Sequence, residues 1–195
     1  MNYPLMNNPY VTFPICEMKK KQVDLCFEWF MAHKDERVEQ LQRFINNETN
    51  KVILDYSVES LIPLWEWFEN HIEFEPRTPE EIEEDVASRP QWMHETVRQY
   101  TEKETLMTMA LAYDISIYFG DTIVKNNPQL YWEYPRKPKK LDGVNEPNIL
   151  GFGTSLNLYL LGVLSVLVKK SHREKDKNRL YNLYEIQMKL LPNNK

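Results

Sequence analysis

Glycine is scarce in this chain, with five among 195 residues. Loops that wrap a nucleotide phosphate need closely spaced glycines, because only glycine lets the backbone approach the phosphate. Gly151 and Gly153 lack both a third glycine and the strand–loop–helix setting. The chain also lacks the Gly-x-Ser-x-Gly pattern of a serine nucleophile. The sequence therefore carries no sign of a nucleotide-binding or hydrolase motif, and we expect no cofactor and no catalytic residues.

Cysteine and histidine are also sparse. Cys16 and Cys26 would lie roughly 15 Å apart if one helix carried both, which is too far for a disulfide. Two cysteines build neither a disulfide framework nor a thiolate zinc site, so we expect reduced, partly buried thiols in a cytoplasmic protein. No histidine has a second one three or four residues away, so we expect no metal site. The four are His33, His71, His94 and His172.

The chain lacks a hydrophobic run long enough to predict a membrane span. Residues 149–168 are uncharged, but the strongly apolar part is only 156–168. A run of that length is typical of a buried helix rather than a membrane helix of about 20 residues. The first fourteen residues contain three prolines and no basic start, so they do not resemble a signal peptide. We expect a soluble protein that makes no membrane contact.

The chain is instead rich in apolar residues at helical spacing. Apolar residues make up 42% of it and aromatics 12%, which is ample for a packed core. Stripes with a period of 3.6 residues predict a mainly α (α+β) fold of about six to eight helices in one domain, residues 1–195. A hinge, if there is one, would fall within 73–90. The expected helical stretches are 17–31, 38–45, 57–72, 78–89, 101–125, 156–170 and 179–191.

Three helix starts are legible. Thr78, Pro79 and Glu81 combine an N-cap, a first-turn proline and a capping box. Thr101 and Glu104 repeat the capping box at the start of the longest expected helix. Ser57 is the expected cap of the helix that follows it.

Two aromatic or β-branched runs predict strands. Residues 130–134 and 148–152 are each bounded by turn-forming residues, and a proline-containing loop lies between them. We expect a small antiparallel β-hairpin with a long loop, packed on the helices.

The charges are segregated, although the net charge is only −5. Residues 69–85 hold eight acidic residues and one arginine, whereas 169–179 hold six basic and two acidic residues. Solvated surface is the simplest interpretation. The two tracts also have the signs to pair with each other, or to bind partners.

One helix face combines polar and aromatic side chains. Asp114, Tyr118 and Asp121 are spaced to share a face of the longest helix, and Tyr131 and Trp132 follow on the first strand of the hairpin. These five are the candidate binding face. The structural alternative is that Asp121 pairs with Lys125 one turn later and Asp114 bonds to nearby backbone.

The hairpin loop carries a cluster of positive charge in residues 136–140, beside the aromatic strand 131–134. Cations beside aromatics can bind single-stranded nucleic acid by phosphate contact and stacking. The acidic chain as a whole argues against nucleic acid as a partner. The alternative is a solvated loop whose neighbouring aromatics face the core.

Two short stretches resemble a known group of proteins. They are 55–61, before a tryptophan-containing helix, and 112–121, followed by Trp132 and by 147–149. Together they resemble small uncharacterised bacterial proteins, some of which are immunity proteins of toxin systems. In that group the glycine is followed by glutamate, whereas Gly120 here precedes Asp121. The resemblance implies a cytoplasmic binder without enzymatic activity.

The function that these features favour is protein binding, with immunity-like neutralisation of a toxin as one form of it. The alternative is a small-ligand binder or enzyme that uses a pocket between the helices and the hairpin. The sequence leaves the partner and the oligomeric state open.

Overall fold

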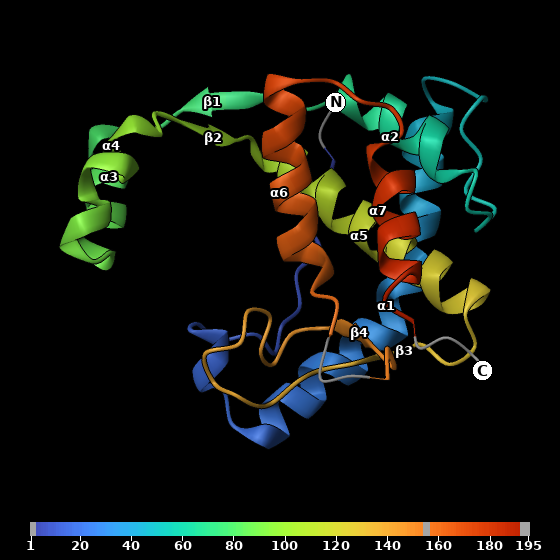
Figure 1. Ribbon diagram of the computed structural model, residues 1–195, viewed down its shortest axis with the longest axis horizontal. Helices are drawn as coiled ribbons and strands as arrows, with labels where there is room; N and C mark the ends of the chain where they lie inside the picture. The colour runs from blue at the N-terminus through green and yellow to red at the C-terminus, as the bar shows by residue number, and fades with distance from the viewer. Residues whose placement is uncertain (1–2, 154–156, 192–195) are drawn as a thin grey trace.

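The structure is a computed structural model that describes residues 3–153 and 157–191. It is mainly α-helical with two small antiparallel sheets, so the predicted fold class is confirmed. Five helices form the body, and two further helices project from it (Figure 1). The body helices are α1 (Lys20–Asn46), α2 (Leu61–Glu69), α5 (Leu106–Asn126), α6 (Leu160–Arg173) and α7 (Arg179–Met188).

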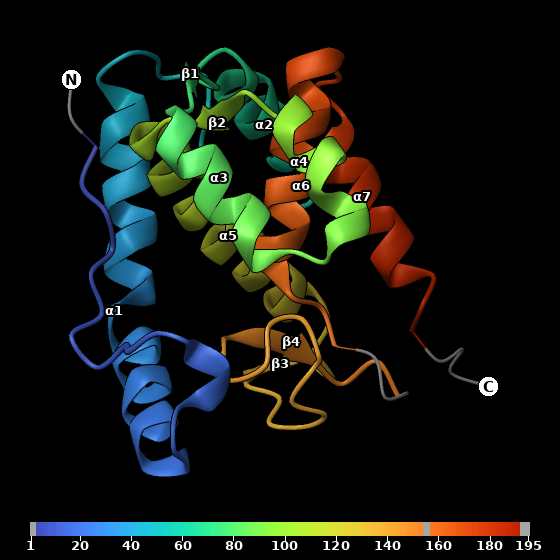
Figure 2. The ribbon, with the colours of Figure 1, turned by 90° about the vertical axis from the view of Figure 1, so that its left-hand side faces the viewer.

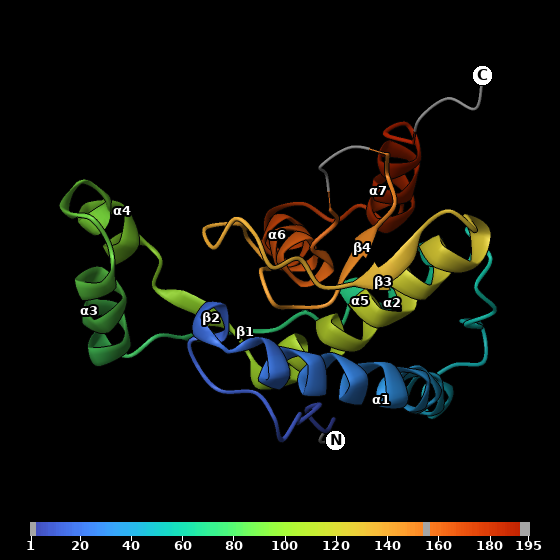
Figure 3. The ribbon, with the colours of Figure 1, turned by 90° about the horizontal axis from the view of Figure 1, so that it is seen from below.

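The central helix of the body is α5. It contacts α1 on one side and α6 on the other, while α7 packs on α2 (Figure 3). Nearly every side chain from Ala110 to Ile123 is buried. A helix buried on all sides belongs in the middle of a domain. Its polar side chains therefore meet packed neighbours instead of water.

The helix α1 runs without a break through the polar tract 33–37, so the two helices expected at 17–31 and 38–45 are one helix. Residues 3–14 lie along α1 as an extended lead-in, and a short 3₁₀ turn (Ile15–Glu17) precedes the helix (Figure 2). Asn8 and Gln22 tie this lead-in to α1. Both cysteines are free, Cys16 exposed and Cys26 buried.

The predicted hairpin is confirmed. Strand β3 (Tyr131–Glu133) pairs antiparallel with β4 (Asn148–Leu150), with Trp132 opposite Ile149. The hairpin packs against α5 through β3, and Ile149 also forms a β-bridge with Leu158. Burial of Ile149 and Leu158 holds these short strands in place.

A second sheet was not predicted. It pairs β1 (Phe74–Pro76) with β2 (Glu102–Glu104), and the chain between them forms helices α3 (Pro79–Ser88) and α4 (His94–Gln99). The 3₁₀ turn Gln91–Met93 joins the two helices. This segment, residues 74–104, projects from the body (Figure 1) and is called the arm.

The predicted helix boundaries are confirmed in part. The capping box at Thr78 is present, with both its hydrogen bonds. The capping box at Thr101 is wrong, because residues 102–104 form β2 and α5 begins later, capped by Thr105. Ser57 caps a turn before α2, whose first residue is Leu61.

The long apolar run forms a shorter helix than expected. Its predicted start, Leu156, lies outside the described residues, and α6 begins at Leu160. In the described part of the chain, no helix combines the length and apolar character needed to cross a membrane.

Candidate functional site

The predicted binding face is mostly internal. Asp114, Tyr118 and Asp121 are each at most 2% exposed, and Trp132 is half-buried. Of the five candidates, Tyr131 alone is open to solvent, at 52% exposure. The structure brings Asp121 and Trp132 together and gives Asp114 and Tyr118 other partners.

Asp114 holds α5 to α1 and to the lead-in. Arg37 donates two hydrogen bonds to its carboxylate at 2.9 and 2.7 Å, and the hydroxyl of Tyr3 donates a third. Burial raises the pKa of Asp114, against the lowering effect of Arg37 and Tyr3. The guanidinium also reaches the backbone oxygen of Pro4. A buried carboxylate with three internal hydrogen bonds fixes packing and does not face solvent, where a ligand would meet it.

Asp121, nearer the C-terminal end of α5, is also a buried carboxylate bonded to a cation of α1. The ammonium of Lys34 donates to both its oxygens, and the indole N–H of Trp132 donates to it at 2.8 Å. The partner is therefore Lys34 of α1 and not Lys125, whose ammonium lies 3.0 Å from the ring centre of Tyr56. This pair joins α1, α5 and the hairpin.

Tyr118 joins the segment 55–61 to α5. Its hydroxyl lies 2.5 Å from the Ser60 hydroxyl and accepts the backbone N–H of Tyr56 at 2.9 Å. The rings of Tyr56 and Tyr118 are 5.1 Å apart. Residues 55–61 and 112–121 therefore meet in space, and these contacts stabilise the fold.

The hairpin loop keeps its cations in solvent. Residues 136–140 are all exposed, whereas Trp132 packs on Phe30 and Tyr134 on Phe27. This leaves Tyr131 as the exposed ring beside the charges, so the loop lacks the row of stacking platforms on which single-stranded nucleic acid binds.

The acidic and basic tracts do approach each other. Glu69 accepts hydrogen bonds from Ser171 and from the backbone of Asp176, and it lies 3.9 Å from Arg179. At the base of the arm, Glu102 pairs with His172 at 3.2 Å. The described residues contain no group of three or more His, Cys, Asp or Glu placed to hold a metal ion.

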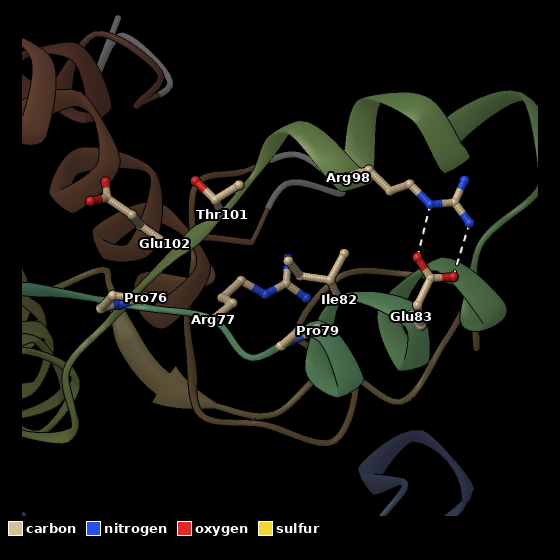
Figure 4. A pocket seen from close by; sticks show the side chains of 8 residues that line it. All are labelled: Pro76, Arg77, Pro79, Ile82, Glu83, Arg98, Thr101 and Glu102. Atoms are coloured by element: carbon tan, nitrogen blue, oxygen red, sulfur yellow. Dashed lines mark hydrogen bonds and ion pairs between the residues drawn. The ribbon is translucent and has the colours of Figure 1, made fainter.

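The arm has few buried side chains, and several ion pairs join its helices and strands. Its only side chains buried below a tenth exposure are Val86 and Val97. Between α3 and α4, Arg98 forms a two-point pair with Glu83 at 2.9 Å (Figure 4). Two valines are a very small core, and each exposed ion pair adds little stability, so the two helices are held together weakly.

The strands of the arm add further pairs. Lys103 lies between Glu75 and Glu81, at 3.4 and 2.5 Å. Arg77 pairs with Asp85 at 3.2 Å. These contacts neutralise much of the acidic tract within the chain itself. Hydrogen bonds from Lys103, Arg98 and Arg89 lower the pKa values of Glu81, Glu83 and Asp85 in that order.

Two hollows flank the arm. One, of about 520 Å³, lies among the strands and helices of the arm, with Ile82 and the Glu83–Arg98 pair at its wall (Figure 4). The other, of about 780 Å³, separates α4 from α6 and is called the arm groove. Met93, Val97 and Tyr100 line the arm side of the groove. Val166 and Arg173 line the α6 side.

Trp92 lies at the far end of the arm, in the turn between α3 and α4, and is 80% exposed. Sequence reasoning missed it, because a lone tryptophan in a polar stretch gives no periodic signal. The available signal was Pro90, which predicts the end of α3 and therefore places Trp92 in a turn.

Comparison of this chain with protein-family models, with curated proteins and with solved structures gives no match.

Proposed function

We propose that the protein is a protein-binding module and that the arm is its binding element. The observation that carries this proposal is Trp92, a large aromatic at 80% exposure on the tip of a projecting arm. Tryptophan is enriched among the residues that dominate binding energy at protein interfaces, where a partner pocket covers it.

The charges on the arm indicate the chemistry of the partner. Glu80, Glu84 and Glu95 are exposed and form no ion pair with any described residue. They leave three negative charges on the arm without a cationic partner among the described residues. A partner that offers an apolar pocket for Trp92 with a basic rim would suit both features, because charge complementarity directs association and orientation.

The arm groove supplies a second contact. Its apolar side chains come from both α4 and α6, so a partner seated there would touch the arm and the body together. Cytoplasmic location, bacterial origin and neutralisation of a toxin belong to the same proposal. The resemblance of 55–61 and 112–121 supports those finer statements.

The test is co-purification from the native host with the tagged chain, comparing wild type with Trp92→Ala. Phe13→Ala is the matched control, because Phe13 is 84% exposed and lies far from the arm along the chain. We expect a partner to be recovered with wild type and control and lost with Trp92→Ala. The partner, once purified, should bind Trp92→Ala at least about tenfold more weakly.

A partner that binds Trp92→Ala as tightly as wild type would overturn the role of the arm. A chain that stays a clean monomer without a partner would overturn protein binding altogether. The immunity form of the proposal has its own test, which is co-expression with toxin genes adjacent to the native gene. Lack of protection against any of them would remove that form.

A further inference from the structure

A second feature lies where the hairpin loop meets α6. Glu146 precedes β4 and lies half-buried against Tyr159, whose hydroxyl is 3.1 Å from both carboxylate oxygens. No lysine, arginine or histidine in residues 3–153 and 157–191 forms an ion pair with Glu146. It differs in this from Asp114, Asp121 and Glu69, each of which faces a cation.

The carboxylate is held firmly in place. The side-chain amide of Asn148 donates to the backbone oxygens of Gly143 and Glu146, each at 2.8 Å. The ring of Tyr159 lies between Gly143 and Gly162, where an added Cβ would come within 2.4 and 2.6 Å of it. Both glycines therefore make room for this ring, and the ring sets the position of the hydroxyl that orients Glu146.

A small cavity of about 30 Å³ adjoins this carboxylate. Four aromatic side chains contribute to its wall: Phe30, Tyr113, Trp132 and Tyr159. Burial raises the pKa of Glu146, as expected for a carboxylate without a countercharge in a largely apolar setting. Aromatic faces and an unpaired carboxylate both attract positive charge.

The size and lining of the cavity narrow the choice of cation. Its volume suits a group no larger than about one water molecule, which excludes guanidinium and quaternary ammonium groups. Metal cations such as calcium need about six oxygen ligands, and the wall is mainly aromatic carbon. A primary ammonium group is small enough for the cavity and does not need a shell of six oxygen ligands.

Glu146 and Tyr159 also line a larger surface groove of about 820 Å³. Much of that groove is apolar, with Leu158, Val163 and Leu183 among its lining side chains. A hydrocarbon chain would lie there while its terminal nitrogen reached Glu146.

We propose that Glu146, Tyr159 and the surrounding aromatic side chains form a binding site for a primary alkylammonium group. The site is independent of the arm and of the proposed partner. The ammonium donates to the Glu146 carboxylate, and the alkyl chain follows the apolar groove. The group belongs either to a free alkylamine or to the side chain of a lysine on another protein.

The test is an NMR titration of the full chain with n-butylammonium chloride at constant ionic strength. The indole N–H of Trp132, assigned with Trp132→Phe, reports on the cavity. We expect a saturable shift with butylammonium and at least about tenfold weaker binding of n-butanol, which has the same chain without the charge. Glu146→Gln should weaken butylammonium binding by at least about tenfold. Asp142→Asn, an exposed carboxyl at the same groove, should change it less than about twofold.

No saturable shift up to about 10 mM would overturn the site. Equal binding of n-butanol, or unchanged binding by Glu146→Gln, would overturn the role of the carboxylate. If Glu146→Gln does not fold, the comparison of butylammonium with butanol on the wild-type chain still decides. Spermidine and Nα-acetyl-lysine amide, titrated in parallel, separate the two sources, because the tighter of them identifies a free amine or a lysine side chain.

Discussion

Asp121 of α5 accepts hydrogen bonds from the ammonium of Lys34 on α1 at 2.9 and 2.8 Å, although 87 residues separate the two in the chain. The carboxylate is 2% exposed and also accepts the indole N–H of Trp132. One buried carboxylate thus joins two helices and the hairpin. Removal of any of these three partners leaves a polar group in the interior without its hydrogen bond.

We predict that Asp121→Ala lowers the free energy of unfolding by about 3 kcal/mol, because Lys34 keeps only its exposed partner Asp35 and the indole N–H of Trp132 loses its acceptor. Lys125→Ala should cost less than about 1 kcal/mol, because it removes only the contact of its ammonium with the ring of Tyr56. Urea unfolding followed by circular dichroism measures both. Equal losses of unfolding free energy in the two variants would mean that Asp121 is paired with Lys125, as the helical spacing alone suggested.

The buried pair of Arg37 and Asp114 leads to a second prediction. Asp114→Ala should lower the free energy of unfolding by about 3–5 kcal/mol, and the double variant Arg37→Met with Asp114→Leu should recover part of that loss. Glu39→Ala is the control, since the Glu39–Arg43 pair is exposed and should contribute less than about 1 kcal/mol. A double variant less stable than Asp114→Ala would contradict this account.

How much of this network the sequence predicts depends on which helix is considered. The polar face of α5 follows from the spacing of Asp114, Tyr118 and Asp121. Its partners do not, because Lys34 and Arg37 lie on another helix and a single sequence does not show which helices pack together. A usable signal was the polar tract 33–37 itself, which places two cations on the same side of a helix with an apolar stripe.

In the arm, the sequence predicts a helix but not the strands. Its helix α3 was predicted from Thr78, Pro79 and Glu81, since capping is a local interaction. Its strands were not, because 74–76 and 102–104 are short and mostly charged and show no alternation of apolar residues. Thr101 and Thr105 both match the start of a helix, and the pairing of β2 with β1 leaves the cap to Thr105.

The ion pairs of the arm predict a loss of local order in acid. Glu81, Glu83 and Asp85 have pKa values lowered by their cationic partners in the folded arm. A lowered pKa stabilises the folded form above the unfolded pKa, and this stability is lost as the pH falls through the folded pKa. We therefore expect amide hydrogen exchange in α3 and α4 to accelerate relative to α5 when the pH falls below about 4.

The intrinsic exchange rate also changes with pH, so the comparison needs rates corrected with a peptide reference. Arg98→Gln removes the two-point pair with Glu83 and should reproduce the faster exchange of the arm at neutral pH. Uniform acceleration of the arm and α5 would mean that the arm does not loosen separately.

Gly120 leads to a prediction about packing. Alanine in place of a helical glycine usually stabilises a protein by about 1 kcal/mol. At Gly120 an added Cβ would come within 2.3 Å of the Trp132 ring and 2.5 Å of Leu160. We expect Gly120→Ala to destabilise the chain by about 1–3 kcal/mol in urea unfolding. Any gain in stability would show that the hairpin lies farther from α5 than described.

The arm should also be removable. The Cα atoms of Phe74 and Glu104 are paired partners, so the chain leaves and re-enters the body at one place. Replacement of residues 75–103 by Asn-Gly, a favoured two-residue hairpin turn, should leave the body folded, with its NMR signals outside the junction unchanged. Loss of the α5 signals would show that the arm is part of the folding unit.

Hydrogen bonds fix the base of the arm to the first turn of α5. Thr108, in the first turn of α5 and fully buried, accepts a hydrogen bond from the backbone of Glu73 and donates to its oxygen. The backbone N–H of Thr105 donates to the same residue at 3.1 Å. The first turn of the central helix α5 is therefore the point at which the arm is anchored to the body. A partner bound at Trp92 would therefore act on the chain at the first turn of the helix that carries Asp114 and Asp121.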